Sequence, residues 1–218
     1  MGSEMCIRDR YRDSYDGYMK WSEQIDNFVR TMDKKKYLVN MKGMCWNNPH
    51  FLEYAIKKVK DRVRELKPYP MIAHQICDEP SMTHYSAPGE LCFCRYCREK
   101  FRAWLKKRYR TVRALNEAWD TKYRSWKEVE PVTSFEILSD SERDNFAPWA
   151  DFREFMDDTF IGTLEALTQA AREERPDVSV GFGGTQSPSA VTGYDFWRWS
   201  RMQTFCEPYN MADSRELL

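Results

Sequence analysis

The sequence predicts an α/β protein built on a parallel sheet, and three observations carry this prediction. Segments with helical periodicity alternate with short apolar runs. The first run, 71–77, is bounded by prolines and apolar enough to be buried on both faces, as parallel strands are. Polar and acidic residues follow the runs, where (β/α)8 barrels and doubly wound sheets both place their active sites. Periodicity does not choose between these two folds. With only three convincing strands, we expect a partial (β/α)8 barrel.

The predicted elements follow from periodicity and capping signals. Asn48 and Pro49 supply a cap and a first-turn proline for a helix that ends at Lys67-Pro68. The best helix is 149–174, where apolar residues recur on one face. The remaining elements are strands at 71–77, 178–183 and 204–209 and short helices at 101–109, 112–119 and 196–202.

The start of the chain differs in character from the rest. Residues 1–10 resemble a translated sequencing adaptor, so we expect a non-native leader there. Residues 11–46 are polar and aromatic with little periodicity, which predicts a loop region before the first helix.

Charge and composition argue against several classes of partner. The 34 basic residues balance 34 acidic ones, so neither nucleic acid nor an anionic membrane would attract the chain as a whole. No apolar stretch approaches the roughly 20 residues of a membrane helix, and no signal peptide is visible. Seven cysteines, three of them crowded together, suit a reducing compartment. We therefore expect a cytoplasmic protein without nucleic-acid or membrane partners.

Cys92, Cys94 and Cys97 lie within six residues, and thiolates at this spacing favour zinc. A fourth ligand would come from Cys45, which directly precedes a helix, or from His84. Four protein ligands would make the zinc structural rather than catalytic. The alternatives are three unrelated buried thiols, or a zinc module for nucleic acid, which would need a second paired cluster.

Asp78 and Glu79 follow the apolar run 71–77 directly. Burial at a strand end raises the pKa of a carboxyl group, which suits Glu79 to general acid catalysis near neutral pH. Taken alone, such a motif is more often a loop cap.

Five segments together resemble glycoside hydrolase family 42, the β-galactosidase family. They are CWNNPHFLEYAIKKVKDRV (45–63), HQICDEP (74–80), the cysteine segment and LNEAW within 92–131, WADFREFMDDTF (149–160) and GYDFWRWSRMQTFCEPYN (193–210). The resemblance implies a (β/α)8 barrel with an acid/base glutamate after strand four and a nucleophile after strand seven. Some members of the family also carry a four-cysteine zinc site.

Carried over by motif, Glu79 is the acid/base, and the zinc ligands are Cys45, Cys92, Cys94 and Cys97. The three strands then correspond to strands four to six, and 47–218 is a partial catalytic domain truncated before strand seven. The resemblance also implies a homotrimer for the full-length protein. Asp78 stands where the family usually has asparagine, and an ionised carboxylate cannot donate a hydrogen bond to a sugar hydroxyl.

The expected parent protein is a retaining glycosidase that hydrolyses β-galactosides or related glycans. Substrate contacts are expected from Asp78, Trp149, Gln186 and Tyr209. Because the nucleophile would lie beyond Leu218, we expect this chain alone to hydrolyse nothing. The alternatives are a non-catalytic carbohydrate-binding relative and a zinc-stabilised interaction module.

Overall fold

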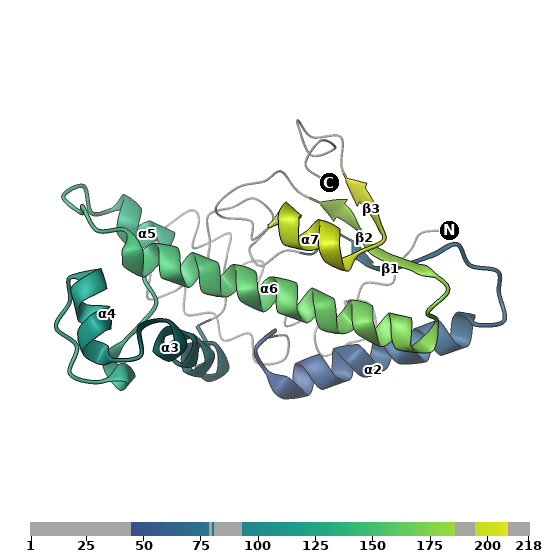
Figure 1. Cartoon of the computed structure of the whole chain (residues 1–218), viewed down its shortest axis with the longest axis horizontal. Helices are drawn as coiled ribbons and strands as arrows, with labels where there is room; N and C mark the ends of the chain where they lie inside the picture. Colours follow the sequence, from purple (N-terminus) through teal and green to yellow (C-terminus); the bar gives the residue numbers. More distant parts are fainter. Residues whose placement is uncertain (1–44, 79, 81–92, 186–194, 209–218) are drawn as a thin grey trace.

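The computed structural model describes residues 45–78, 80, 93–185 and 195–208. Its centre is a three-stranded parallel sheet, shown in Figure 1. The strands are β1 (Ala73–Asp78), β2 (Ser179–Thr185) and β3 (Phe205–Pro208), and they neighbour one another in chain order. Both pairs, β1 with β2 and β2 with β3, are parallel. The predicted α/β class and the parallel sheet are therefore confirmed.

Helices connect and flank the strands. They are α2 (Pro49–Leu66), α3 (Arg95–Tyr109), α4 (Val112–Trp119), the 3-10 turn η2 (Trp126–Glu128), α5 (Ser134–Leu138), α6 (Ala147–Glu174) and α7 (Phe196–Met202). The bounds of α4 and α7 agree with those predicted. Asn48 caps α2 by accepting from the backbone N–H of His50, and Asp195 caps α7 by accepting from that of Arg198.

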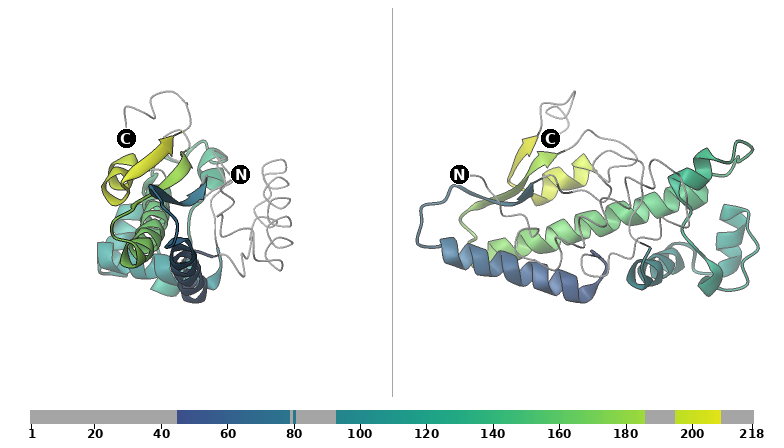
Figure 2. Two further views of the ribbon diagram at one scale, coloured as in Figure 1. Left: turned by 90° about the vertical axis from the view of Figure 1, so that its right-hand side faces the viewer. Right: turned by 180° about the vertical axis from the view of Figure 1, so that it is seen from behind.

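The molecule has two layers: the sheet, and the helices that include α6 (Figures 1 and 2). Figures 1 and 2 show α2 running alongside the C-terminal half of α6, with both helices on one side of the sheet. The N-terminal half of α6 extends past the sheet and carries α3, α4 and α5 around it. Its apolar face supplies much of the core, including the fully buried Phe160, Ile161 and Leu164. Burial of this face, rather than local propensity, holds so long a helix in place.

Burial alternates along β1. His74 and Ile76 are buried, while Ala73, Gln75 and Cys77 are only half-buried. The sequence predicts that both faces of this strand are buried, and in β1 one face is buried and the other is half-buried. Burial lowers the pKa of His74, which favours the neutral ring.

Two helices differ from the prediction. α3 begins at Arg95, whereas the predicted helix begins at 101. The prediction missed the first turns because they carry few apolar residues and give no periodic signal. The short helix α5 lies in a stretch expected to be irregular. Thr133 and Glu136 form a capping box there: the Glu136 carboxylate accepts from the Thr133 backbone N–H at 2.9 Å, and the Thr133 hydroxyl accepts from the Glu136 N–H at 3.3 Å.

Across the described part of the chain, every helix is too short or too polar to span a bilayer.

A buried carboxylate joins three helices at the N-terminal end of α6. Asp151, 3% exposed, accepts hydrogen bonds from the Tyr109 hydroxyl at 2.6 Å and from the Trp119 indole at 2.7 Å. Arg108 lies 3.2 Å from its other oxygen. These contacts tie α3 and α4 to α6 through one side chain.

Replacing Asp151 with alanine is expected to lower the free energy of unfolding by about 3 kcal/mol, because the buried Trp119 indole and the half-buried Tyr109 hydroxyl lose their acceptor. Glu154→Ala is the matched control. Glu154 binds the same arginine at 2.6 Å but is exposed, so its loss should cost less than about 1 kcal/mol. Urea denaturation of both variants measures the difference. Equal small losses would show that the buried carboxylate is not the link between the three helices.

Candidate functional site

The carboxyl ends of the three strands meet at one edge of the sheet. Asp78 ends β1, is exposed, and lies opposite Gly183 of β2. The register shifts between Gln75 and Asp78 in one strand pair, and between Gly183 and Thr185 in the other. Such irregularities are common beside active sites, where they redirect side chains. Glu79, Gln186 and Tyr209 directly follow the three strands and lie outside the described residues.

Trp149, the other residue expected to contact substrate, lies in the first turn of α6. Its half-buried indole N–H donates to the Ser134 hydroxyl at 2.9 Å, which fixes the ring against the start of α5. Figure 1 shows this end of α6 away from the sheet. The described residues therefore do not bring Trp149 beside Asp78, and its contact with substrate stays a prediction.

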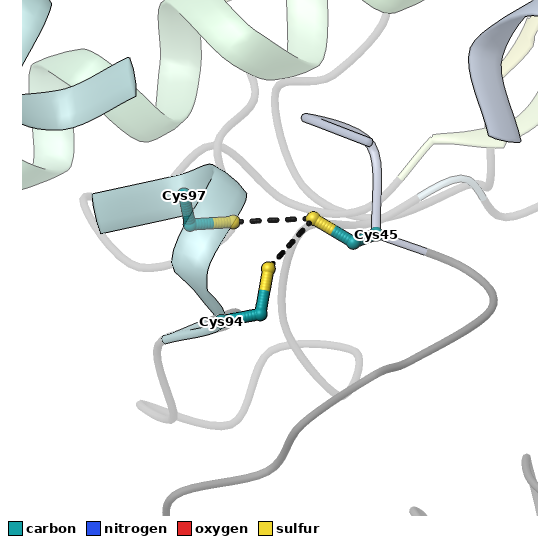
Figure 3. Close-up of side chains that lie close together, drawn as sticks. All are labelled: Cys45, Cys94 and Cys97. Carbon is teal, nitrogen blue, oxygen red and sulfur yellow. Dashed lines mark hydrogen bonds between the residues drawn. The ribbon is translucent and has the colours of Figure 1, made fainter. Parts of the chain in front are cut away.

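Three of the four predicted metal ligands converge. Figure 3 shows the sulfur of Cys45 facing those of Cys94 and Cys97, at 3.3 Å from each. All three sulfurs lie within 4.8 Å of one another, and all three residues are buried. We call this group the thiol cluster. Such an arrangement of soft donors can hold a metal ion. Cys92 and the rival ligand His84 lie outside the described residues.

The thiol cluster joins two segments that are distant in sequence. Cys45 begins a turn closed by the Asn48 N–H donating to its carbonyl at 2.8 Å. Cys94 directly precedes α3, and Cys97 lies in its first turn. The cysteines therefore come from a turn and a helix start, not only from the single tight loop expected for 92–97.

Aromatic contacts with α6 hold both segments of the thiol cluster. The Trp46 ring lies 5.2 Å from Phe160, and the Phe93 ring lies 5.6 Å from Phe152. Trp46 is partly buried and packs against the core. Each cysteine segment is thus anchored by an aromatic residue adjacent to a cysteine.

Sequence reasoning missed an acidic group on α6. Burial raises the pKa of Asp157 to about 6, and the nearby carboxylates of Asp195 and Asp158 act in the same direction, while Arg153 and Arg198 oppose the rise. Among the described residues, no group donates a hydrogen bond to its Oδ1. The signal in the sequence was an acidic residue within an otherwise apolar helical stripe.

The raised pKa of Asp157 makes stability depend on pH. The folded state binds a proton that the unfolded state has already released, so this contribution is complete below about pH 4 and is lost as pH rises through about 6. Asp157→Asn should therefore be more stable than the unsubstituted chain at pH 7.5, by on the order of 3 kcal/mol. The two should converge below pH 4. Thermal unfolding between pH 3.5 and 7.5 measures this, and a constant difference would contradict it.

Solved structures place this fold within one class of α/β protein. The β-galactosidase from Bacillus circulans sp. alkalophilus superposes with a TM-score of 0.60 at 23% identity, covering 77% of this chain and 24% of that one. A Rahnella β-galactosidase gives a TM-score of 0.60 at 22% identity, covering 79% and 25%. At these identities the similarity concerns the fold alone: an α/β fold with a small parallel sheet, similar to part of these enzymes.

The chain belongs to glycoside hydrolase family 42, whose model is described as β-galactosidase and matches residues 24–214. The β-galactosidase BgaP of Planococcus sp. is 24% identical over 177 residues, covering 77% of this chain and 24% of the relative. That of Geobacillus kaustophilus is 26% identical over 179 residues, covering 79% and 25%. A Thermus thermophilus β-galactosidase is 54% identical over 44 residues, covering 18% and 7%. The chain spans about a quarter of the length of the first two relatives.

Proposed function

We propose that this chain is part of a retaining glycoside hydrolase that cleaves β-galactosides or related glycans. The observation that carries the proposal is the sheet: three parallel strands in chain order send the segments that follow them out at one edge. In a (β/α)8 barrel that edge is the catalytic one. The strands would be the fourth to sixth of the barrel, with Glu79 after the fourth.

The chemistry follows from two carboxyl groups. A retaining glycosidase holds them about 5–5.5 Å apart, one as acid and then base, the other as nucleophile. Glu79 would protonate the glycosidic oxygen as the bond to the sugar breaks. It would then deprotonate the water that hydrolyses the glycosyl-enzyme. Asp78 would accept a hydrogen bond from a sugar hydroxyl and so orient the ring.

The product's stereochemistry tests this proposal. The complete protein is incubated with a β-galactoside in deuterated buffer, and NMR follows the first sugar released before it mutarotates. The expected product is the β-anomer. An α-anomer would exclude the double displacement. The absence of turnover on β-galactosides and related glycans would favour the non-catalytic carbohydrate-binding alternative instead.

We also propose that the thiol cluster binds a structural zinc ion, with Cys92 as its fourth ligand. Zinc–sulfur bonds of about 2.3 Å in a tetrahedron separate the sulfurs by about 3.8 Å. The separations of 3.3 Å from Cys45 to its two neighbours would need only a small expansion. Four thiolates would close the coordination sphere, so zinc would hold the turn at Cys45 against α3 and take no part in hydrolysis.

Elemental analysis tests the metal assignment. Protein purified without chelators is expected to contain one zinc per chain, and Cys94→Ser should lose most of it. A cysteine outside the thiol cluster provides the control: Cys206→Ser, in β3, should keep its zinc. Equal zinc contents in both variants would remove the thiol cluster as the binding site.

A further inference from the structure

A buried amide lies against the thiol cluster. Asn47 is 7% exposed, and its side-chain Nδ2 lies 3.4 Å from the sulfur of Cys97. The same nitrogen lies 3.5 Å from the hydroxyl oxygen of Thr159 on α6. A side-chain amide carries two N–H groups, so one can point at the sulfur and the other at the hydroxyl.

A thiolate-bound metal needs such a donor. Four thiolates around Zn²⁺ leave two excess negative charges on the sulfurs, and buried charge is costly unless hydrogen bonds offset it. An amide N–H directed at one sulfur stabilises this charge without adding a cation. Groups outside the coordination sphere also fix the orientation of the ligands themselves.

The surroundings of Asn47 hold its amide in one orientation. The turn from Cys45 to Asn48 is closed by a backbone hydrogen bond, so the chain direction at Asn47 is fixed. Its neighbour Trp46 packs on Phe160, the residue after Thr159, so two consecutive residues of the turn contact two consecutive residues of α6.

We propose that Asn47 is a positioning residue of the metal site: its amide donates to the Cys97 sulfur, and Thr159 orients it. This inference rests on the proposed zinc site. The inference also gives α6 a role at the metal site. The helix supplies no cysteine to the thiol cluster, but its Thr159 would orient the Asn47 amide that donates to the Cys97 sulfur.

The test measures zinc affinity of the 218-residue chain by competition with a chelating dye. Asn47→Leu and Asn47→Asp keep the number of side-chain heavy atoms and the branch at Cγ but remove the N–H donor. Both are expected to bind zinc about 10–100-fold more weakly, the usual effect of losing an outer-shell partner. Thr159→Val keeps the donor and removes only its orienting partner, so a smaller weakening is expected. The second readout is the cobalt-substituted protein, whose sulfur-to-cobalt charge-transfer bands should shift in both Asn47 variants.

The adjacent asparagine provides the matched control. Asn48 is also buried, but its side chain caps α2 by accepting from the His50 N–H, and no sulfur contact links it to the thiol cluster among the described residues. Asn48→Ala should therefore lower stability by about 1 kcal/mol while keeping zinc affinity and the cobalt spectrum. Circular dichroism checks that each variant folds.

The outcomes separate this inference from the zinc proposal. If the unsubstituted chain binds no zinc, the zinc site itself is wrong, and the role of Asn47 falls with it. If the chain binds zinc and both Asn47 variants match it in affinity and cobalt spectrum, the zinc site stands and only the role of Asn47 is overturned. An equal loss of affinity in Asn48→Ala would assign the effect to the fold of the turn, which also overturns it.

Discussion

Replacing Glu79 with glutamine in the complete enzyme is expected to lower kcat on an unactivated galactoside by about 10²–10⁴-fold, the usual contribution of a general acid/base. Glutamine has a similar shape but cannot transfer the proton. A nitrophenyl leaving group departs without protonation, so formation of the glycosyl-enzyme should be spared on that substrate. The subsequent attack by water still needs a base. Azide needs none, and adding it should restore turnover of the nitrophenyl substrate.

Glu53→Gln is the control for this experiment. It makes the same chemical change on the exposed face of α2 and should leave kcat unaltered. If Glu79→Gln retained full activity toward the unactivated galactoside, Glu79 would not be the acid/base. A large loss that azide does not rescue would point to a structural role at the strand end instead.

Removal of the proposed zinc ion is expected to destabilise the chain more than any single substitution considered above. Structural zinc contributes up to about 10–16 kcal/mol of apparent binding free energy in small zinc domains. Here an extensive aromatic core supports the fold independently, so we expect a lower midpoint of thermal unfolding rather than complete unfolding. The turn at Cys45 should loosen first, because it reaches α3 through the thiol cluster.

Hydrogen exchange with and without a strong chelator measures this local effect. Faster exchange is expected at the start of α2 and in the first turn of α3, with little change in α4. Re-adding zinc should restore the original rates. Exchange that is unchanged by chelation, in protein confirmed to have lost its metal, would contradict a structural role for the ion.

The parts of the fold that were predictable are those in which local signals and packing agree. α2 has a cap, a first-turn proline and a regular stripe of Ala55, Val59 and Val63, and all three stripe residues are buried. The parallel sheet followed from a helix between every two strands. α3 was predicted only from Phe101 onward. Its first turns are rich in charge and give no periodic signal, although Cys97 and Phe101 on this part of the helix are buried.

The sequence predicts which residue types form the candidate site, but it does not predict how their side chains are arranged in space. Cys45 was a reasonable partner for the other cysteines because it directly precedes a helix, and the sulfurs do converge. Periodicity treats a charged residue such as Asp151 as outward-facing, yet Tyr109 and Trp119 approach it from other helices. The role proposed for Asn47 also depends on contacts between distant segments, which sequence spacing does not encode.

The length of α6 has a mechanical consequence. Its 28 residues span about 42 Å, whereas the seven residues of β2 span only about 23 Å, so the helix cannot be matched to the sheet along its whole length. One end is braced by α2 and the strands, and the other by α3 and α4. Because α6 is one continuous helix, it connects the elements packed at its two ends. The thiol cluster meets α6 near its middle, at Thr159 and Phe160, so the turn at Cys45 is tied to both braced ends through one helix.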